Sequence, residues 1–156
     1  MIAQEITFLN EQALTLQDQG LSRRDAIHQI VDTVLNRIRQ IPGHLEKHPF
    51  PLEHDFADGI YMRTIYSPAG TMVVGLQHRF SHFCYIESGH VSVLTDDGPK
   101  ELKGPCIFKS PAGSRRVVYH HTDVVWRTFH ATNSTDPDEI EVEITYPEEE
   151  GVSSLG

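Results

Sequence analysis

The sequence predicts a mainly β domain, an antiparallel barrel or sandwich preceded by helices. From residue 60 to residue 131, about eight short strand-like runs alternate with turns rich in glycine, proline and aspartate. Before them, residues 22 to 41 repeat apolar residues at helical spacing. Short strands at regular intervals are typical of all-β sandwiches and barrels. With 156 residues, of which 38% are hydrophobic, the chain is long enough for one such domain with additions, but not for two.

The N-terminal region, residues 1 to 43, is predicted to be helical. Residues 5 to 19 form a short helix that ends at Gly20, because glycine is favoured just beyond a helix C-terminus. Ser22, followed three residues later by Asp25, resembles a capping box and begins a second helix. The apolar face of this second helix consists of Ile27, Ile30, Val31, Val34, Leu35, Ile38 and Ile41. Such a face packs on its own barrel or pairs with the same helix of a second copy.

A connector, residues 44 to 59, joins the helices to the barrel. Its proline, histidine and charged residues are typical of extended chain rather than of a regular element. His44, His48 and His54 lie at spacings that fix no common geometry around a metal. We therefore interpret them as solvent-exposed or capping residues.

The barrel is predicted to cover residues 60 to 146, followed by a C-terminal tail from residue 147 to residue 156. Its expected strands are residues 60–66, 71–78, 82–86, 90–95, 100–103, 106–110, 115–119 and 124–131. Residues 140–144 alternate apolar and acidic side chains and are predicted to form a further strand. The alternative is a short helix that begins at Asp136.

The charge distribution argues against nucleic acid as a partner. The net charge is −9, and residues 136 to 150 contribute eight acidic residues and no lysine or arginine. Residues 56 to 135 carry eight basic and six acidic residues, so the barrel is almost neutral. A nucleic-acid surface needs clustered positive charge to displace counterions from phosphates.

Cysteine usage and hydropathy predict a cytoplasmic protein. Cys84 and Cys106 lie in apolar runs without a CxxC spacing, which favours reduced thiols over a disulfide framework. The first 20 residues lack the basic start and apolar run of a signal peptide, and no stretch is long enough to span a membrane.

Residues that could bind a metal lie where two predicted strands meet. His78 ends one strand and His82 begins the next, so a hairpin-length connection can bring the two imidazoles together. Neutral imidazole is a common ligand of Zn, Fe, Ni and Cu. His130, which shares a strand face with Trp126 and Thr128, is the expected third ligand. The alternative is that His130 is a hydrogen-bonded core residue.

The segment that contains these histidines resembles the first motif of the cupin superfamily, which is glycine, five residues, His-x-His, three or four residues, glutamate, six residues and glycine. The motif glycines fall on Gly70 and Gly89, its second histidine on His78 and its glutamate on His82. Leu76 replaces the first histidine, which is a ligand in metal-binding cupins.

Residues 104 to 120 are similar to the second cupin motif. Arg116 takes the position of the motif histidine, and His120 that of the asparagine. His120 and His121 lie at a predicted turn, and we interpret them as solvated unless one of them reaches the site at the barrel rim. The resemblance covers about residues 60 to 131 and implies a jelly-roll barrel with a ligand cavity. It also implies a divalent metal such as Zn, Fe, Ni or Mn, for which the expected ligands are His78, His82 and His130.

If Arg116 faces inward, as the motif histidine would, its positive charge predicts an anionic ligand. A buried guanidinium needs a carboxylate or phosphate partner. The alternative is an internal partner such as Glu87 or Asp123. Strand alternation means that the neighbouring Arg115 cannot face inward as well. The expected ligand-binding residues are Arg116, Tyr119 and Trp126.

Two classes of function follow from these features. The first is binding of a small anionic molecule, such as a sugar acid, sugar nucleotide or keto acid, by a histidine- or metal-dependent enzyme. The second is a non-catalytic scaffold that uses the barrel for protein contacts. Residues 119 to 132 also resemble small cupin-like proteins of tailed bacteriophages, which would imply the host cytoplasm and a possible assembly or virion role. The second helix and an exposed sheet edge predict a homodimer or larger homo-oligomer.

Overall fold

The computed structural model describes residues 2–43, 50–147 and 151–154. Its helices are α1 (Ile2–Asp18), α2 (Arg23–Arg39) and α3 (Pro137–Ile144). Its strands are β1 (Leu52–Ala57), β2 (Ile60–Ser67), β3 (Thr71–Val74), β4 (His82–Ser88), β5 (His90–Thr95), β6 (Gly98–Lys103), β7 (Cys106–Ser110), β8 (Val117–His120), β9 (Val124–Ala131) and β10 (Gly151–Ser154).

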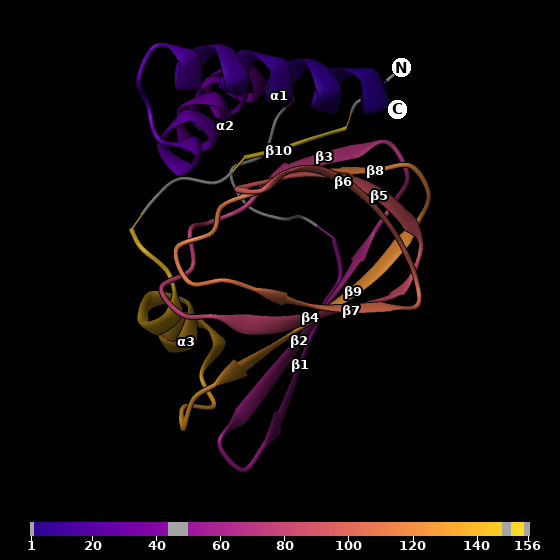
Figure 1. Ribbon diagram of the computed structural model, residues 1–156. Helices are drawn as coiled ribbons and strands as arrows, with labels where there is room; N and C mark the ends of the chain where they lie inside the picture. The colour runs from indigo at the N-terminus through magenta and orange to yellow at the C-terminus, as the bar shows by residue number, and fades with distance from the viewer. Residues whose placement is uncertain (1, 44–49, 148–150, 155–156) are drawn as a thin grey trace.

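The strands form two antiparallel sheets of five strands each. Sheet 1 has the order β1-β2-β9-β4-β7, and sheet 2 has the order β10-β3-β8-β5-β6. Sheet 2 lies between sheet 1 and the pair of helices α1 and α2, while α3 lies beside one end of sheet 1 (Figure 1). None of the helices in the described part of the chain is long and apolar enough to cross a membrane.

Two apolar layers hold this arrangement together. One lies between the sheets and contains Cys84, Ile86, Val91, Val93, Val118, Val124 and Trp126. The other lies between sheet 2 and the helices. Along β8 the side chains alternate between these layers, so Val117 packs toward the helices and Val118 toward sheet 1. Cys84 and Cys106 are both free thiols, as expected.

Helix α2 is formed as its sequence pattern predicts. The side chain of Ser22, the N-cap residue, accepts a hydrogen bond from the backbone N–H of Asp25. The helix buries Ala26, Ile27, Ile30, Val31, Val34, Leu35 and Ile38. Because this face packs against α1 and sheet 2 of the same chain, it is not free to pair with a second copy.

The segment predicted to be an extended connector contains a regular strand. β1 pairs with β2 in antiparallel register, with Leu52 opposite Ile65. An edge strand leaves a row of unpaired N–H and C=O groups, and β1 satisfies those of β2. His54 lies on β1 and is exposed, while His44 and His48 fall outside the described residues. β10 likewise pairs with β3 from within the predicted C-terminal tail.

The predicted strand at residues 140–144 is wrong, because these residues belong to α3. Asp136 caps the helix by accepting a hydrogen bond from the N–H of Asp138. Ile140 and Ile144 are buried whereas Val142 is 77% exposed. A strand would place these three side chains on one face, but a helix separates Val142 from the other two. Proline in the first turn also favours the helix.

Replacing a buried valine of α2 is expected to destabilise the fold. Val31→Ala removes two methyl groups from a fully buried position and should lower the free energy of unfolding by about 2 kcal/mol. Urea denaturation followed by circular dichroism measures this change. Val142→Ala on α3 is the matched control, with an expected change within about 0.5 kcal/mol. Equal losses in the two variants would contradict this view of the core.

Candidate metal and ligand site

A cavity of about 330 Å³ lies inside the molecule, next to the inward faces of β2, β8 and β9. Helix α3 forms part of its wall through Ile140 and Ile144. Its polar lining includes His54, Tyr61, Arg63, His78, Ser114, Arg116, His120, Thr128, His130, Asp138 and Glu141. Every inward-facing position of β9 from Val124 to His130 reaches this cavity, as strand alternation predicts.

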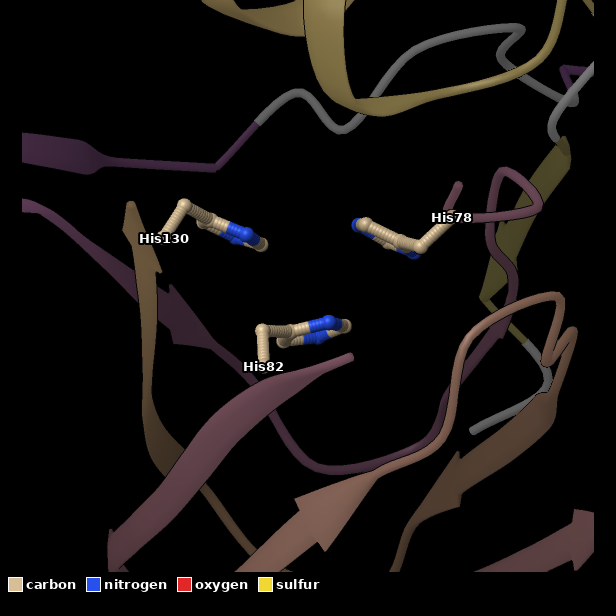
Figure 2. Close-up of side chains that lie close together, drawn as sticks. All are labelled: His78, His82 and His130. Carbon is tan, nitrogen blue, oxygen red and sulfur yellow. The ribbon is translucent and has the colours of Figure 1, made fainter. Parts of the chain in front are cut away.

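Three histidines, His78, His82 and His130, point toward one another (Figure 2), and two of them, His78 and His130, line the cavity. Each of His78, His82 and His130 offers a ring nitrogen, and these nitrogens all lie within 4.8 Å of one another. The ring centroid of His82 is 4.5 Å from that of His78 and 4.5 Å from that of His130. The structure therefore brings together the three residues that the sequence predicts as metal ligands.

Strand pairing explains how His82 and His130 come to adjoin. β4 pairs with β9 so that Phe83 lies opposite Phe129 and Cys84 opposite Thr128. The same antiparallel register, continued by one position, places His82 opposite His130. Side chains at such positions point to the same face of the sheet, so the two imidazoles are cross-strand neighbours.

His78 reaches the other two histidines from outside sheet 1. It follows β3, and its backbone forms an isolated β-bridge with Thr145 just after α3. The His78 N–H donates to the carbonyl of Ser114, and the His78 carbonyl accepts from the N–H of Gly113. The expected strand over residues 71–78 is thus shorter, and its last residue is held by the β7–β8 loop and the end of α3.

Hydrogen bonds leave a nitrogen of His82 available to a metal. The Nδ1 atom of His82 lies 3.4 Å from the carbonyl oxygen of Phe80, to which it can donate a proton. Its Nε2 atom is buried and has no hydrogen-bond partner among the described residues. A ligand histidine commonly donates its second N–H to a backbone carbonyl, which fixes the tautomer and exposes the other lone pair.

The surroundings keep all three imidazoles neutral near pH 7. Burial, followed by the neighbouring charge of His82 and Arg116, lowers the pKa of His78 from 6.5 to about 2. Burial and then Arg116 lower the pKa of His82 to about 4, and burial and then His82 lower the pKa of His130 to about 3. A neutral imidazole has the lone pair that metal coordination requires.

The donor set fits a divalent transition metal. Three imidazole nitrogens with open positions for water or ligand match the common catalytic arrangement around zinc. Bonds of about 2.1 Å place tetrahedral donors about 3.4 Å apart. Small side-chain rotations would bring donors that lie within 4.8 Å to this separation.

Arg116 faces the cavity without an acidic partner. Its guanidinium carbon lies 5.5 Å from the centroid of the Trp126 ring, and its Nη1 atom is 3.7 Å from the sulfur of Cys84. The internal partners considered from the sequence are engaged elsewhere: Glu87 pairs with Arg127, and Asp123 accepts from the N–H of Ala69. In the part of the chain that the structure describes, no carboxylate forms an ion pair with Arg116.

Arg63 and Tyr61, which were not among the residues predicted from the sequence, line the same cavity from β2. Arg63 also forms no ion pair within the described residues. Tyr61 is 3% exposed, and its hydroxyl lies 2.6 Å from the Nδ1 atom of His54. Burial raises the pKa of Tyr61. Strand alternation could have identified both residues, because the side chains of residues 61, 63 and 65 point to the same face of β2.

Two expectations from the sequence need correction. Tyr119 was expected to bind the ligand with Arg116, but it lies on the opposite face of β8 and packs beneath the helices. His120 was expected to be solvated, but it is 5% exposed and faces the cavity, with its Nδ1 atom 2.8 Å from the hydroxyl of Ser67. Arg115, which was expected not to face inward with Arg116, also lines the cavity, but its guanidinium pairs with Asp32 on α2.

Comparison with known proteins supports the fold. No protein-family model matches the chain, and no curated protein matches its sequence. The structure is similar to that of the ectoine synthase from P. lautus, with 12% identity, a TM-score of 0.52, and coverage of 73% of this chain and 86% of that chain.

Two cupin structures are also similar. The cupin domain of Schizosaccharomyces pombe Cnp3 has 18% identity and a TM-score of 0.47, with 62% of this chain and 72% of that chain covered. A cupin-2 domain containing protein from Shewanella frigidimarina has 9% identity and a TM-score of 0.46, with coverage of 56% and 85%. The predicted fold class is confirmed: the protein is mainly β, an antiparallel jelly roll with N-terminal helices, similar in fold to the ectoine synthase.

Removing the buried imidazoles is expected to make metal-free protein less sensitive to acid. The pKa values of the folded state lie below 6.5, so the unfolded state binds more protons as the pH falls from about 6.5 toward 4. The free energy of unfolding should therefore decrease across this window. Urea denaturation with chelator at about pH 7 and about pH 5 should show a larger decrease for the wild type than for a variant with His78→Gln, His82→Gln and His130→Gln. All other histidines are common to both proteins, and equal decreases would contradict the assignment.

Proposed function

We propose that this protein binds a small anionic molecule in its cavity, beside a divalent metal held by His78, His82 and His130. Two observations carry the proposal: His78, His130, Arg63 and Arg116 line one cavity, and the donor nitrogens of His78, His82 and His130 lie within 4.8 Å of one another. Arg63 and Arg116 are half-buried, and guanidinium groups that lose part of their water without a carboxylate partner are stabilised by an anion. Imidazoles whose ring nitrogens lie this close together are typical of metal sites.

The metal would be Zn, Fe, Ni or Mn. Imidazole donors suit the first three of these ions well, and the neutral donor set leaves the charge of the ion uncompensated. An anionic ligand therefore gains from the ion as well as from the arginines. When bound, the metal supplies a Lewis acid that polarises an oxygen of the ligand. The chain itself orients the ligand and excludes water from it.

The cavity favours a small acid over a larger nucleotide-linked molecule. Its volume of about 330 Å³ lies at the lower end of the range of ligand pockets, about 300–1,000 Å³. A keto acid or sugar acid fits this space better than a sugar nucleotide. Arg116 and Arg63 would bind its carboxylate, and the ring of Trp126 would pack against its apolar part.

The metal and the anion are expected to depend on different residues. His78→Ala and His82→Ala should each abolish stoichiometric metal binding, because two remaining imidazoles do not form the site. Arg116→Ala should retain the metal but weaken binding of a small dicarboxylate at least about tenfold, the effect of a lost charge-assisted hydrogen bond. Elemental analysis measures the metal, and calorimetric titration measures the dicarboxylate.

The Arg116→Ala protein is the matched control for the histidine variants, since it alters the same cavity without removing a metal ligand. Circular dichroism checks that all variants fold. Metal retained at wild-type stoichiometry after loss of both His78 and His82 would refute the metal part. Unchanged dicarboxylate affinity in Arg116→Ala would refute the anion part.

A scaffold role, in which the protein acts by contacts with other chains, is the second candidate. The observation that favours it is the apolar outer face of sheet 1, where Phe83 is 55% and Ile107 is 67% exposed. Phe129 lies opposite Phe83 on the same face. Assignment to tailed bacteriophages, a virion or assembly role, and location in the cytoplasm or in that of a host stay predictions from the sequence.

This face also supports the proposed homo-oligomer. The apolar side of α2 is covered within the chain, whereas the outer face of sheet 1 offers an exposed apolar surface for a partner. We propose a second copy as this partner, because a two-fold axis would place the apolar patch around Ile107 against itself. Aromatic and aliphatic side chains are typical of the centre of such interfaces.

Ile107→Glu is expected to dissociate the oligomer into monomers of 17.7 kDa, because an interface would bury the new carboxylate without a partner. Light scattering over a wide concentration range measures the mass. Val142→Glu is the control, since Val142 is also exposed but lies on α3. A wild-type mass of 17.7 kDa at every concentration would refute the oligomer.

A further inference from the structure

A second cluster of metal-competent side chains lies outside the cavity. It consists of His90 on β5, Glu101 on β6 and His121 just after β8, whose donor atoms all lie within 4.8 Å of one another. The cluster lies on the face of sheet 2 that carries the helices. Val91 and Val93 point to the other face of β5, toward sheet 1. Sheet 2 therefore separates this cluster from the cavity.

The sheet holds the cluster rigidly. The N–H of His121 donates to the carbonyl of His90, so these two residues are fixed side by side across neighbouring strands. Glu101 lies on the edge strand β6, directly opposite Ser92. The ring centroids of His90 and His121 are 4.4 Å apart. Donors held in place by strand pairing lose little conformational freedom when they bind an ion.

A buried hydroxyl orients two of the three donors. Ser92 is 2% exposed, and its hydroxyl lies 3.2 Å from Glu101 Oε1 and 2.6 Å from His121 Nε2. The other carboxylate oxygen of Glu101, Oε2, lies 3.3 Å from His90 Nε2. Outer hydrogen bonds of this kind are what position the ligands of metal sites. Among the described residues, no lysine or arginine pairs with Glu101 and competes for its charge.

We propose that His90, Glu101 and His121 form a second divalent-metal site, suited to Zn²⁺, on the outer face of sheet 2. Two imidazoles and one carboxylate are a donor set that zinc uses, with water in the fourth position. The side chain of Glu101 is 59% exposed, so an ion can enter from solvent. An ion here would link β6, the edge strand, to β5 and to the end of β8. It would therefore stabilise the fold rather than take part in chemistry in the cavity.

Zinc counting in a protein that lacks the inner site tests this proposal. In the His78→Ala/His82→Ala background, equilibrium dialysis against excess Zn²⁺ followed by elemental analysis should find one equivalent of zinc. Adding Glu101→Gln and His121→Ala should remove that equivalent. The same pair of substitutions should also abolish the increase in melting temperature that Zn²⁺ causes in the background protein, since an ion that binds only the folded state stabilises it.

The matched control is His28→Ala. His28 Nε2 forms a comparable contact with Asp96, at 3.1 Å, but without a second histidine, so this change should leave the zinc content unaltered. If the background protein does not fold, Glu101→Gln/His121→Ala in the otherwise wild-type chain should still lower the zinc content by one equivalent. No bound zinc in the folded background protein, or no drop when Glu101 and His121 are changed, would overturn the proposal.

Discussion

The burial of sheet 2 on both of its faces is the constraint on which the rest of the structure depends. A sheet with one polar face needs a single apolar partner, but β8 buries Val117 and Val118 on opposite sides. Helices α1 and α2 cover one side, and sheet 1 covers the other. Helices α1 and α2 bury the apolar outer face of sheet 2. The space between the two sheets can therefore hold polar side chains at one end while the apolar core stays continuous.

Placing polar side chains at this end of the space between the sheets costs free energy. Removing three imidazoles and two guanidinium groups from water is unfavourable for their charged forms. The histidines respond by staying neutral, as their lowered pKa values show. The arginines cannot lose their protons, so their charge has to be offset by an anion or shielded by aromatic faces, as Trp126 does for Arg116. A site of this kind is more readily explained by a ligand than by fold stability.

Much of the fold and the inward facing of His82 and His130 could be predicted from the sequence, because both follow from the strand period of two. His78 reaches these residues through a loop that joins the two sheets, not through the expected hairpin. That period places His130 on one face with Trp126 and Thr128, and it places Tyr119 on the face opposite to that of Arg116. β1 and β10 could not be predicted, since their pairing depends on edges supplied by distant strands. The alternation of apolar and acidic residues at 140–144 is compatible with a strand or a helix. The N-cap at Asp136 favours the helix that the structure contains.

The attachment of His78 has a consequence for how the inner site exchanges its contents. His82 and His130 belong to the same sheet, whereas His78 is held by backbone contacts to Thr145 and the loop before β8. Arg79 continues this attachment, since its N–H donates to the carbonyl of Ile144. Detachment of α3, a helix of only eight residues, would therefore free one side of the His78 backbone and open the cavity wall in a single local event. Release of the proposed ion and entry of the proposed ligand would then share one barrier, which depends on how firmly the short helix docks rather than on the stability of the sheets.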